Sequence, residues 1–475
     1  MTLVQNRTIA LLLGLLLLAG VACFAWWDQP VFILAPFAVL AGLFFVQNPA
    51  YLFYALMAAI PWSIEYSVTP TLGTDLPDEP MMLLLSFSVI VLLGRYKYGW
   101  KKAMHPLLFL LAAQVLWMLL ASVASTDLLL SFKFLLAKSW YLLAFVAAPL
   151  IFFRDEKFLV RSVSILLGSM LIFVALALVR HAQNGWTFGK INDSLQPFYR
   201  NHVNYSALLV MMVPLQVALI RLTASRSWRR FITVTLIVTL GALYFSYARG
   251  AWLALFTGLF AYWAIRKKVL LISFILFFTI CFATLGWLAR NDRYVQLSGD
   301  YRTTIFHTNF REHLIATYEL KDMSNAERIY RWVAGVRMAG DGWRTGFGPA
   351  TFYHQYKPYT VPAFKTWVSR NEEQSTVHNY FLLTLIEQGV PGLILLLLLI
   401  GSLFWYAEKI YHRTDSHFWK VVITAAAVVL MMECTVNFLS DLVETDKIGS
   451  VFYICLATII IADRKTRKQI VKGDV

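Results

Sequence analysis

The sequence has 475 residues, of which 59% are hydrophobic and 15% are charged, and its formal net charge is +15. A soluble domain is usually about 45–50% apolar and about 25% charged, so this composition excludes an ordinary soluble protein. The positive charge does not indicate nucleic-acid binding. The lysines and arginines gather in short segments between long apolar runs, where a basic excess sets the orientation of a membrane protein.

Apolar runs of roughly 17–25 residues predict transmembrane helices along most of the chain. We place these helices at 8–27, 30–47, 51–66, 81–94, 106–124, 133–153, 162–180, 205–221, 231–247, 250–265, 268–289, 379–405, 419–440 and 448–463. The predicted fold class is an all-α polytopic membrane protein with about 12–14 transmembrane helices. It divides into N-terminal transmembrane helices at 1–289, a long loop at 290–376, C-terminal transmembrane helices at 377–463 and a basic tail at 464–475.

Charge in the connecting segments predicts the orientation. Basic segments alternate with acidic or neutral ones along the chain, and the basic side of a membrane protein faces the cytoplasm. The basic segments are 95–102, 154–161, 221–230, 266–268, 409–420 and the tail, and the acidic ones include 74–79 and 441–446. Both termini are therefore expected in the cytoplasm, and the loop 290–376 outside it.

The long loop is the main hydrophilic segment, and it carries signs of structure. Apolar residues recur at helical spacing from 325 to 338, at Ile329, Val333 and Val336. Long ordered loops are commonly lids or binding elements. We expect a small external subdomain that covers a site in the membrane-spanning part.

Three residues at predicted helix starts on this outer side are candidates for chemistry. His378 begins the helix that follows the loop, and imidazole is the side chain best suited to proton transfer near neutral pH. Arg200 precedes another helix, where its guanidinium group and free backbone N–H groups favour a phosphate. Arg249 lies between two apolar runs and breaks the positive-inside pattern, and an ionisable residue at membrane depth usually marks a ligand or a pathway. The alternatives are a structural histidine and arginines that contact lipid headgroups.

Polar residues also recur within the apolar runs near the C-terminus. Glu433, Asn437 and Asp441 are spaced by four and share a helix face, and we expect Glu433 to pair with a buried arginine. The spacing of Glu387, nine residues after His378, leaves its role open. The histidines lack metal-ligand spacing and no phosphate-binding glycine loop is present, so we predict neither a metal nor another cofactor.

Three motifs together resemble the O-antigen ligase/O-antigen polymerase family. They are SYARGAWL at 246–253, GFGPATF at 346–352 and HNYFLLTLIEQGVPG at 378–392, in that order and with the long loop before the histidine. Arg200 resembles the upstream arginine of this family. The similarity covers roughly residues 195–400.

The resemblance implies a metal-independent, inverting glycosyltransferase in the bacterial inner membrane, with a periplasmic active site. Its donor would be a glycan on undecaprenyl pyrophosphate. The acceptor would be lipid A-core in a ligase, another lipid-linked glycan in a polymerase, or a protein hydroxyl in an O-oligosaccharyltransferase. Of these we favour the ligase. A polyprenyl-linked glycan transporter or flippase is the alternative of another class.

The resemblance also assigns residue roles. His378 would be the general base, and Arg200 and Arg249 would bind the pyrophosphate. Additional substrate contacts are expected from Arg328, Arg331, Asn379 and Tyr247.

Overall fold

A computed structural model of the chain describes residues 42, 44–69, 72–95, 104–297, 323–366, 368–372 and 374–473. The predicted helix at 8–27 and nearly all of the one at 30–47 lie outside the described residues, as does the 298–322 part of the long loop.

Helices make up nearly all of the described structure. Their bounds are α3 Pro49–Ala59, α4 Asp78–Arg95, α6 Pro106–Val123, α7 Leu128–Leu142, α8 Ala148–Phe152, α9 Glu156–Gln183, α10 Ile191–Leu195, α11 His202–Leu222, α12 Arg226–Phe245, α13 Arg249–Lys267, α14 Leu270–Ala289, α16 Met323–Asp341, α17 Phe352–Gln355, α18 Tyr380–Arg413, α19 His417–Leu439 and α20 Asp446–Gly473. A π-helical turn, Leu143–Ala147, joins α7 to α8. Eight helical segments of the described residues are long and apolar enough to cross a membrane, which confirms the prediction of a polytopic helical membrane protein.

The structure corrects the predicted helix at 51–66. Helix α3 ends at Ala59, and a two-stranded antiparallel hairpin follows, with β1 Ile64–Thr69 paired to β2 Leu72–Leu76. The β1 sequence alternates between polar residues and residues with aromatic or β-branched side chains, which suits a half-exposed strand rather than a helix. At the other end of the chain, α20 continues through the basic tail to Gly473.

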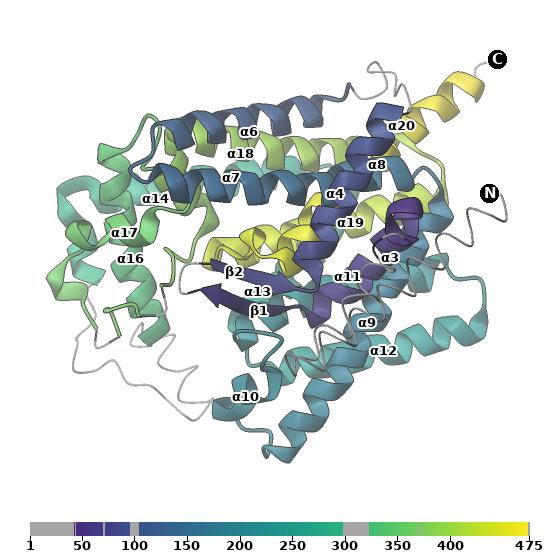
Figure 1. Cartoon of the computed structure of the whole chain (residues 1–475), viewed down its shortest axis with the longest axis horizontal. Helices are drawn as coiled ribbons and strands as arrows, with labels where there is room; N and C mark the ends of the chain where they lie inside the picture. The colour runs from purple at the N-terminus through teal and green to yellow at the C-terminus, as the bar shows by residue number, and fades with distance from the viewer. Residues whose placement is uncertain are drawn as a thin grey trace, which may run out of the picture.

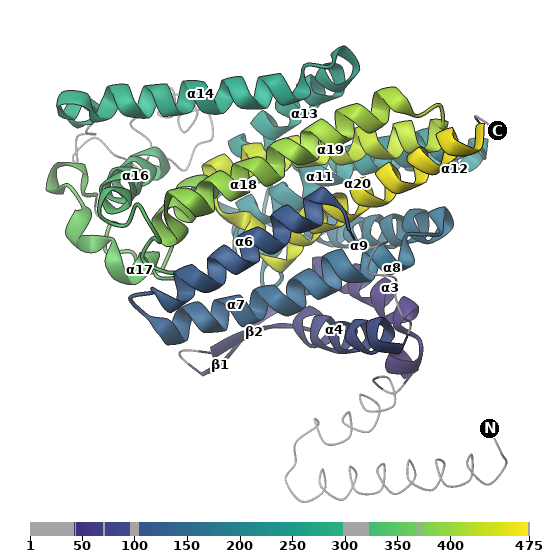
Figure 2. The ribbon, with the colours of Figure 1, turned by 90° about the horizontal axis from the view of Figure 1, so that it is seen from above.

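The helices form one bundle around α18 and α19. Helix α19 packs against α11, α13, α18 and α20, and α18 also packs against α6. Figures 1 and 2 show α6, α7 and α18 side by side, with α16 and α17 gathered at one end of these helices. The backbone N–H of Tyr380 donates to the carbonyl of Ser440 at 2.9 Å, so the start of α18 and the end of α19 meet at this same end.

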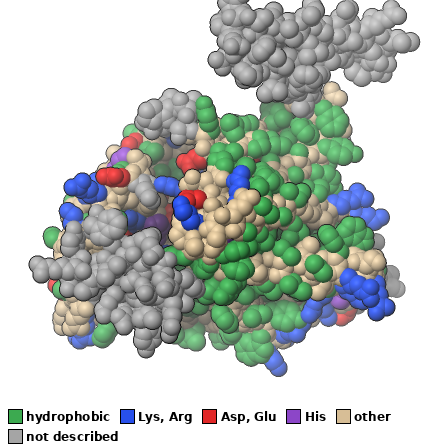
Figure 3. Space-filling model, turned by 90° about the horizontal axis from the view of Figure 1, so that it is seen from below, with side chains coloured by type: hydrophobic (Ala, Val, Ile, Leu, Met, Phe, Trp, Pro, Cys, Tyr) green, Lys and Arg blue, Asp and Glu red, His purple; other side chains and the backbone are tan. Residues whose placement is uncertain are grey.

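The molecular surface matches this architecture. Large apolar side chains are exposed along the helices, including Leu129 (75% exposed), Phe256 (69%) and Ile272 (65%). Figure 3 shows a broad hydrophobic belt between an end of mixed charge and an end where basic side chains predominate. A belt of this extent suits a lipid environment, because monomeric soluble proteins rarely expose large contiguous apolar patches.

Candidate functional site

Helix capping positions His378 at the mixed-charge end of the bundle. Asn379 caps α18, its Oδ1 accepting a hydrogen bond from the backbone N–H of Leu382 at 3.0 Å. Asn201 caps α11 in the same way, through the N–H groups of Val203 and Asn204. Asparagine is among the preferred N-cap residues because its side chain satisfies these free donors. His378 and Arg200 therefore each occupy the position just before a capped membrane helix.

The backbone of His378 is unusual. Its φ of +53° lies in the left-handed region, which a residue with a Cβ atom rarely adopts. Tyr247, in the arginine motif, has a φ of +55°. Such conformations persist where the surroundings fix them, and they often mark functional sites.

Asp441 faces the imidazole of His378. Its Oδ1 lies 3.9 Å from Nδ1 of His378, while the hydroxyl of Thr376 donates to its Oδ2 at 2.6 Å. Burial raises the pKa of Asp441, although the bond from Thr376 and the charge of Arg331 favour its ionised form. Asp441 is not among the site residues predicted from the sequence. The available signal was its place at the end of a row of polar residues spaced by four on α19.

Helix α16 brings arginines to the same place. Arg331 is buried, with Nη2 3.3 Å from Glu327 Oε2 and Nη1 donating to the carbonyl of Thr376 at 3.3 Å. The indole N–H of Trp332 donates to the carbonyl of Val377 at 3.0 Å. These hydrogen bonds hold α16 against the segment that carries His378. Thr366 and Ser369 donate to Glu327 in turn, so the whole arrangement is fixed by hydrogen bonds.

The surroundings keep His378 neutral. Removal from water, together with the charges of Arg331, Arg328 and Arg200, lowers the pKa of His378 to about 3. Both causes act against the charged form of an imidazole. The side chain is still 35% exposed, so the neutral ring is accessible. Figure 3 shows basic, acidic and histidine side chains gathered around a hollow at this end of the molecule.

Arg249 and Tyr247 lie at the start of α13, at the same end of the bundle. A Cβ atom added to Gly250 would lie 3.4 Å from Leu439, so this helix start adjoins the end of α19. The Tyr247 hydroxyl donates to the carbonyl of Trp186 at 2.7 Å. The Phe188 ring lies 5.7 Å from the Tyr247 ring and 5.9 Å from that of His202, which links the two arginine-bearing segments.

The GFGPATF motif at 346–352 is hydrogen-bonded to the middle of the HNYFLLTLIEQGVPG motif at 378–392. The N–H groups of Phe347 and Gly348 donate to the carbonyls of Ile386 and Glu387, each at 3.0 Å. The Glu387 carboxylate is buried and accepts from the N–H of Phe352 at 3.3 Å. The open role of Glu387 is thus to anchor the loop onto α18. Gly346 has a φ of +72°, and a methyl group there would overlap the backbone of Glu387.

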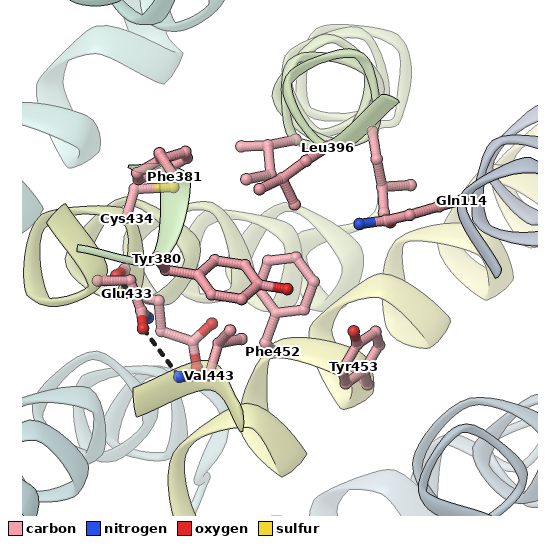
Figure 4. A pocket seen from close by; sticks show the side chains of 12 residues that line it. Gln114, Tyr380, Phe381, Leu396, Glu433, Cys434, Val443, Phe452 and Tyr453 are labelled. Carbon is pink, nitrogen blue, oxygen red and sulfur yellow. Dashed lines mark hydrogen bonds between the residues drawn. The ribbon is translucent and has the colours of Figure 1, made fainter. Parts of the chain in front are cut away.

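The structure also corrects the expectation that Glu433 pairs with a buried arginine. It lines a small pocket beneath Tyr380 (Figure 4), and neither carboxylate oxygen has a hydrogen-bond partner among the described residues. The expected pairing with a buried arginine is therefore absent from this part of the chain. Asn437, one turn further, accepts from the N–H of Val443 at 2.8 Å and shapes the turn after α19. In the described part of the chain, no group of three or more histidine, cysteine, aspartate or glutamate residues is placed to hold a metal.

The fold and the site define a multi-pass membrane protein whose arginine-rich, histidine-containing site lies at one end of the bundle, beneath a folded loop. Residues 234–397 match the protein-family model described as O-antigen ligase. The match covers about a third of the chain. It supports the O-antigen ligase/polymerase family that the motifs predicted, and it suggests a glycosyltransferase-like enzyme. The matched segment contains Arg249, Arg328, Arg331 and His378, whereas Arg200 and Asp441 lie outside it. No curated protein matches the chain.

Proposed function

We propose that the protein transfers a glycan from undecaprenyl pyrophosphate to an acceptor hydroxyl at the periplasmic face of the bacterial inner membrane, as an O-antigen ligase with lipid A-core as acceptor. The termini would then lie in the cytoplasm. The observation that carries the proposal is His378 at 3.9 Å from Asp441, with its pKa lowered by burial and by the charges of Arg331, Arg328 and Arg200.

The arginines suit the leaving group of this reaction. As the bond between the anomeric carbon and the diphosphate oxygen breaks, its electron pair passes to the diphosphate, whose negative charge grows. Guanidinium groups already in place stabilise that charge, and they do so most strongly in the transition state. We assign this role to Arg200 and Arg249, with Arg328 as a further contact. Arg331 is held by Glu327, so it acts through its charge and by positioning the loop.

His378 suits the incoming acceptor. Its Nδ1 faces Asp441, which leaves Nε2 to accept the proton of the acceptor hydroxyl as the oxygen attacks the anomeric carbon. The Asp441 carboxylate then stabilises the imidazolium that forms, as the aspartate does in a catalytic triad. A single displacement of this kind inverts the anomeric configuration.

The low pKa of free His378 makes donor binding part of the mechanism. A base with a pKa of about 3 is always neutral at physiological pH, but it holds a proton weakly. The bound diphosphate brings negative charge to Arg200 and Arg328, which are two of the three arginines that depress this pKa. It therefore raises the pKa of His378 and makes the ring a stronger base only when the donor is present.

The test is reconstitution with a lipid-linked glycan and candidate acceptors, without ATP or added metal. A single glycan on lipid A-core supports a ligase, a ladder on the carrier indicates a polymerase, and glycoprotein indicates an O-oligosaccharyltransferase. His378→Ala should abolish transfer but retain donor binding, whereas His354→Ala, which removes an exposed histidine of the loop, should leave both unchanged. Transfer by His378→Ala at the wild-type rate would refute the assignment of the base.

Arg249 is tested by a substitution that keeps its charge. Lysine lacks the guanidinium fork that binds two phosphate oxygens at once. Arg249→Lys should weaken donor binding about tenfold, the loss of one charge-assisted hydrogen bond worth about 1.5 kcal/mol. Wild-type affinity in this variant would show that the two-point phosphate contact is wrong.

A further inference from the structure

A second cavity lies at the end of the bundle opposite His378. It has a volume of about 430 Å³ and is lined mainly by α11, α13 and α19. Its cationic lining residues come from the last turns of α11 and α13, at Arg221 and Arg266, and from the first turn of α19, at Lys420. The opposite ends of these three helices adjoin Arg200, Arg249 and Asp441, so the cavity is separate from the proposed transfer site.

Two arginines converge at the mouth of this cavity. Arg221 Nη2 donates to the Tyr262 hydroxyl at 2.7 Å, and Arg266 Nη2 donates to the same hydroxyl. Their guanidinium carbons lie 5.5 and 3.9 Å from the centre of the Tyr262 ring. None of the described residues that line the cavity is acidic. Like charges held this close repel each other, and an anion between them would remove the repulsion.

Apart from His417, Thr424 and two tyrosines, the rest of the cavity is apolar, and it has the depth of one leaflet. From Arg221 back to Val213 the α11 wall rises about 12 Å, and from Lys420 to Met432 the α19 wall rises about 18 Å, at about 1.5 Å per residue. The hydrocarbon layer of one leaflet is about 15 Å deep. Between these walls the lining is Val217, Leu255, Leu259 and Val428.

We infer that this cavity binds an anionic phospholipid, with its phosphate between Arg221, Arg266 and Lys420 and an acyl chain along the apolar walls. A free phosphate would satisfy the charges but would leave the walls unused. A zwitterionic lipid would fill the groove but would bring its own cation to the arginines. Basic pockets between transmembrane helices are a recognised way to bind anionic headgroups.

The experiment uses the delipidated full-length protein in detergent, with bound lipid counted by native mass spectrometry. The probes are dioleoyl phosphatidylglycerol, dioleoyl phosphatidylcholine and glycerol 1-phosphate. The wild type should bind phosphatidylglycerol about 25-fold more tightly than the double variant Arg221→Ala/Arg266→Ala, at about fivefold for each arginine. The matched control Arg229→Ala/Arg230→Ala removes two exposed arginines that do not line the cavity, and it should stay within about twofold of the wild type.

Three results would overturn the inference. The first is equal phosphatidylglycerol binding by the wild type and the double variant, and the second is an equal loss in the control. The third is displacement of the lipid by glycerol 1-phosphate, which would indicate a site for a free anion. If the double variant does not fold, Val217→Trp carries the test. It keeps both arginines and fills the groove, so undiminished lipid binding by this variant would also overturn the inference.

Discussion

The state of His378 makes a sharp prediction about pH. The base is competent when neutral, so activity is retained above its pKa and is lost as pH falls through it. An imidazole with the ordinary pKa of about 6.5 is only about 9% neutral at pH 5.5 and would lose about tenfold in rate. With a pKa of about 3, His378 stays more than about 99% neutral at that pH.

The assay is kcat/KM for the lipid-linked donor between pH 5.5 and 7.5, because this constant reports the free enzyme. We expect it to change by less than about twofold over this range in the wild type. Arg328→Gln removes one of the charges that depress the pKa of His378, so its acid limb should move to higher pH. The pH profile of kcat reports the enzyme–donor complex, in which the diphosphate raises the pKa of His378. Its acid limb should therefore lie at higher pH than the acid limb of kcat/KM.

Two variants make the profile interpretable. Arg337→Gln removes an exposed arginine from α16 and should leave the profile unchanged. Asp441→Asn removes the titration of the facing carboxylate, whose pKa burial also raises. A wild-type acid limb near pH 6.5 that Arg328→Gln does not move would refute the reasoning, because it would place His378 outside the field of the arginines.

Three further predictions concern parts of the site. Asp441→Asn should lower kcat at least about sixfold, because a charge pair at 3.9 Å is worth about 1 kcal/mol in water and more in a partly buried site. Glu387→Ala leaves the buried N–H of Phe352 without its acceptor, so it should lower the free energy of unfolding by about 1–3 kcal/mol. Glu387→Gln retains an acceptor and should lower it less. Gly346→Ala places a side chain at a φ of +72°, at about 1–2 kcal/mol. It also overlaps the α18 backbone, so it should reduce transfer, whereas Gly340→Ala enters open space and should not.

Each of these three predictions would be contradicted by a specific result. Unchanged kcat in Asp441→Asn would mean that the carboxylate does not support the imidazolium. Equal unfolding temperatures for Glu387→Ala and Glu387→Gln would mean that the bond to the loop contributes nothing. Transfer by Gly346→Ala at the level of Gly340→Ala would mean that the docked loop is not needed.

The helices were predictable because their signals are local. The predicted helix at 106–124 is α6, Pro106–Val123, and the predicted loop helix at 325–338 lies within α16, Met323–Asp341. Apolar run length and periodicity depend only on neighbouring residues. The hairpin at 64–76 was missed because a short strand, joined to a helix by apolar residues, reads as part of the same apolar run.

By itself, the sequence determined the class of protein, its family motifs and the placement of His378 and Arg200 beside helix starts, since each follows from composition or from a few adjacent residues. Tertiary structure alone decided that Asp441 faces His378, that Arg331 is tied to Glu327 and Thr376, and that Glu387 anchors the loop. The bond from Thr376 to Asp441 joins residues 65 positions apart. Contacts of that separation depend on how whole helices pack, which no local pattern specifies.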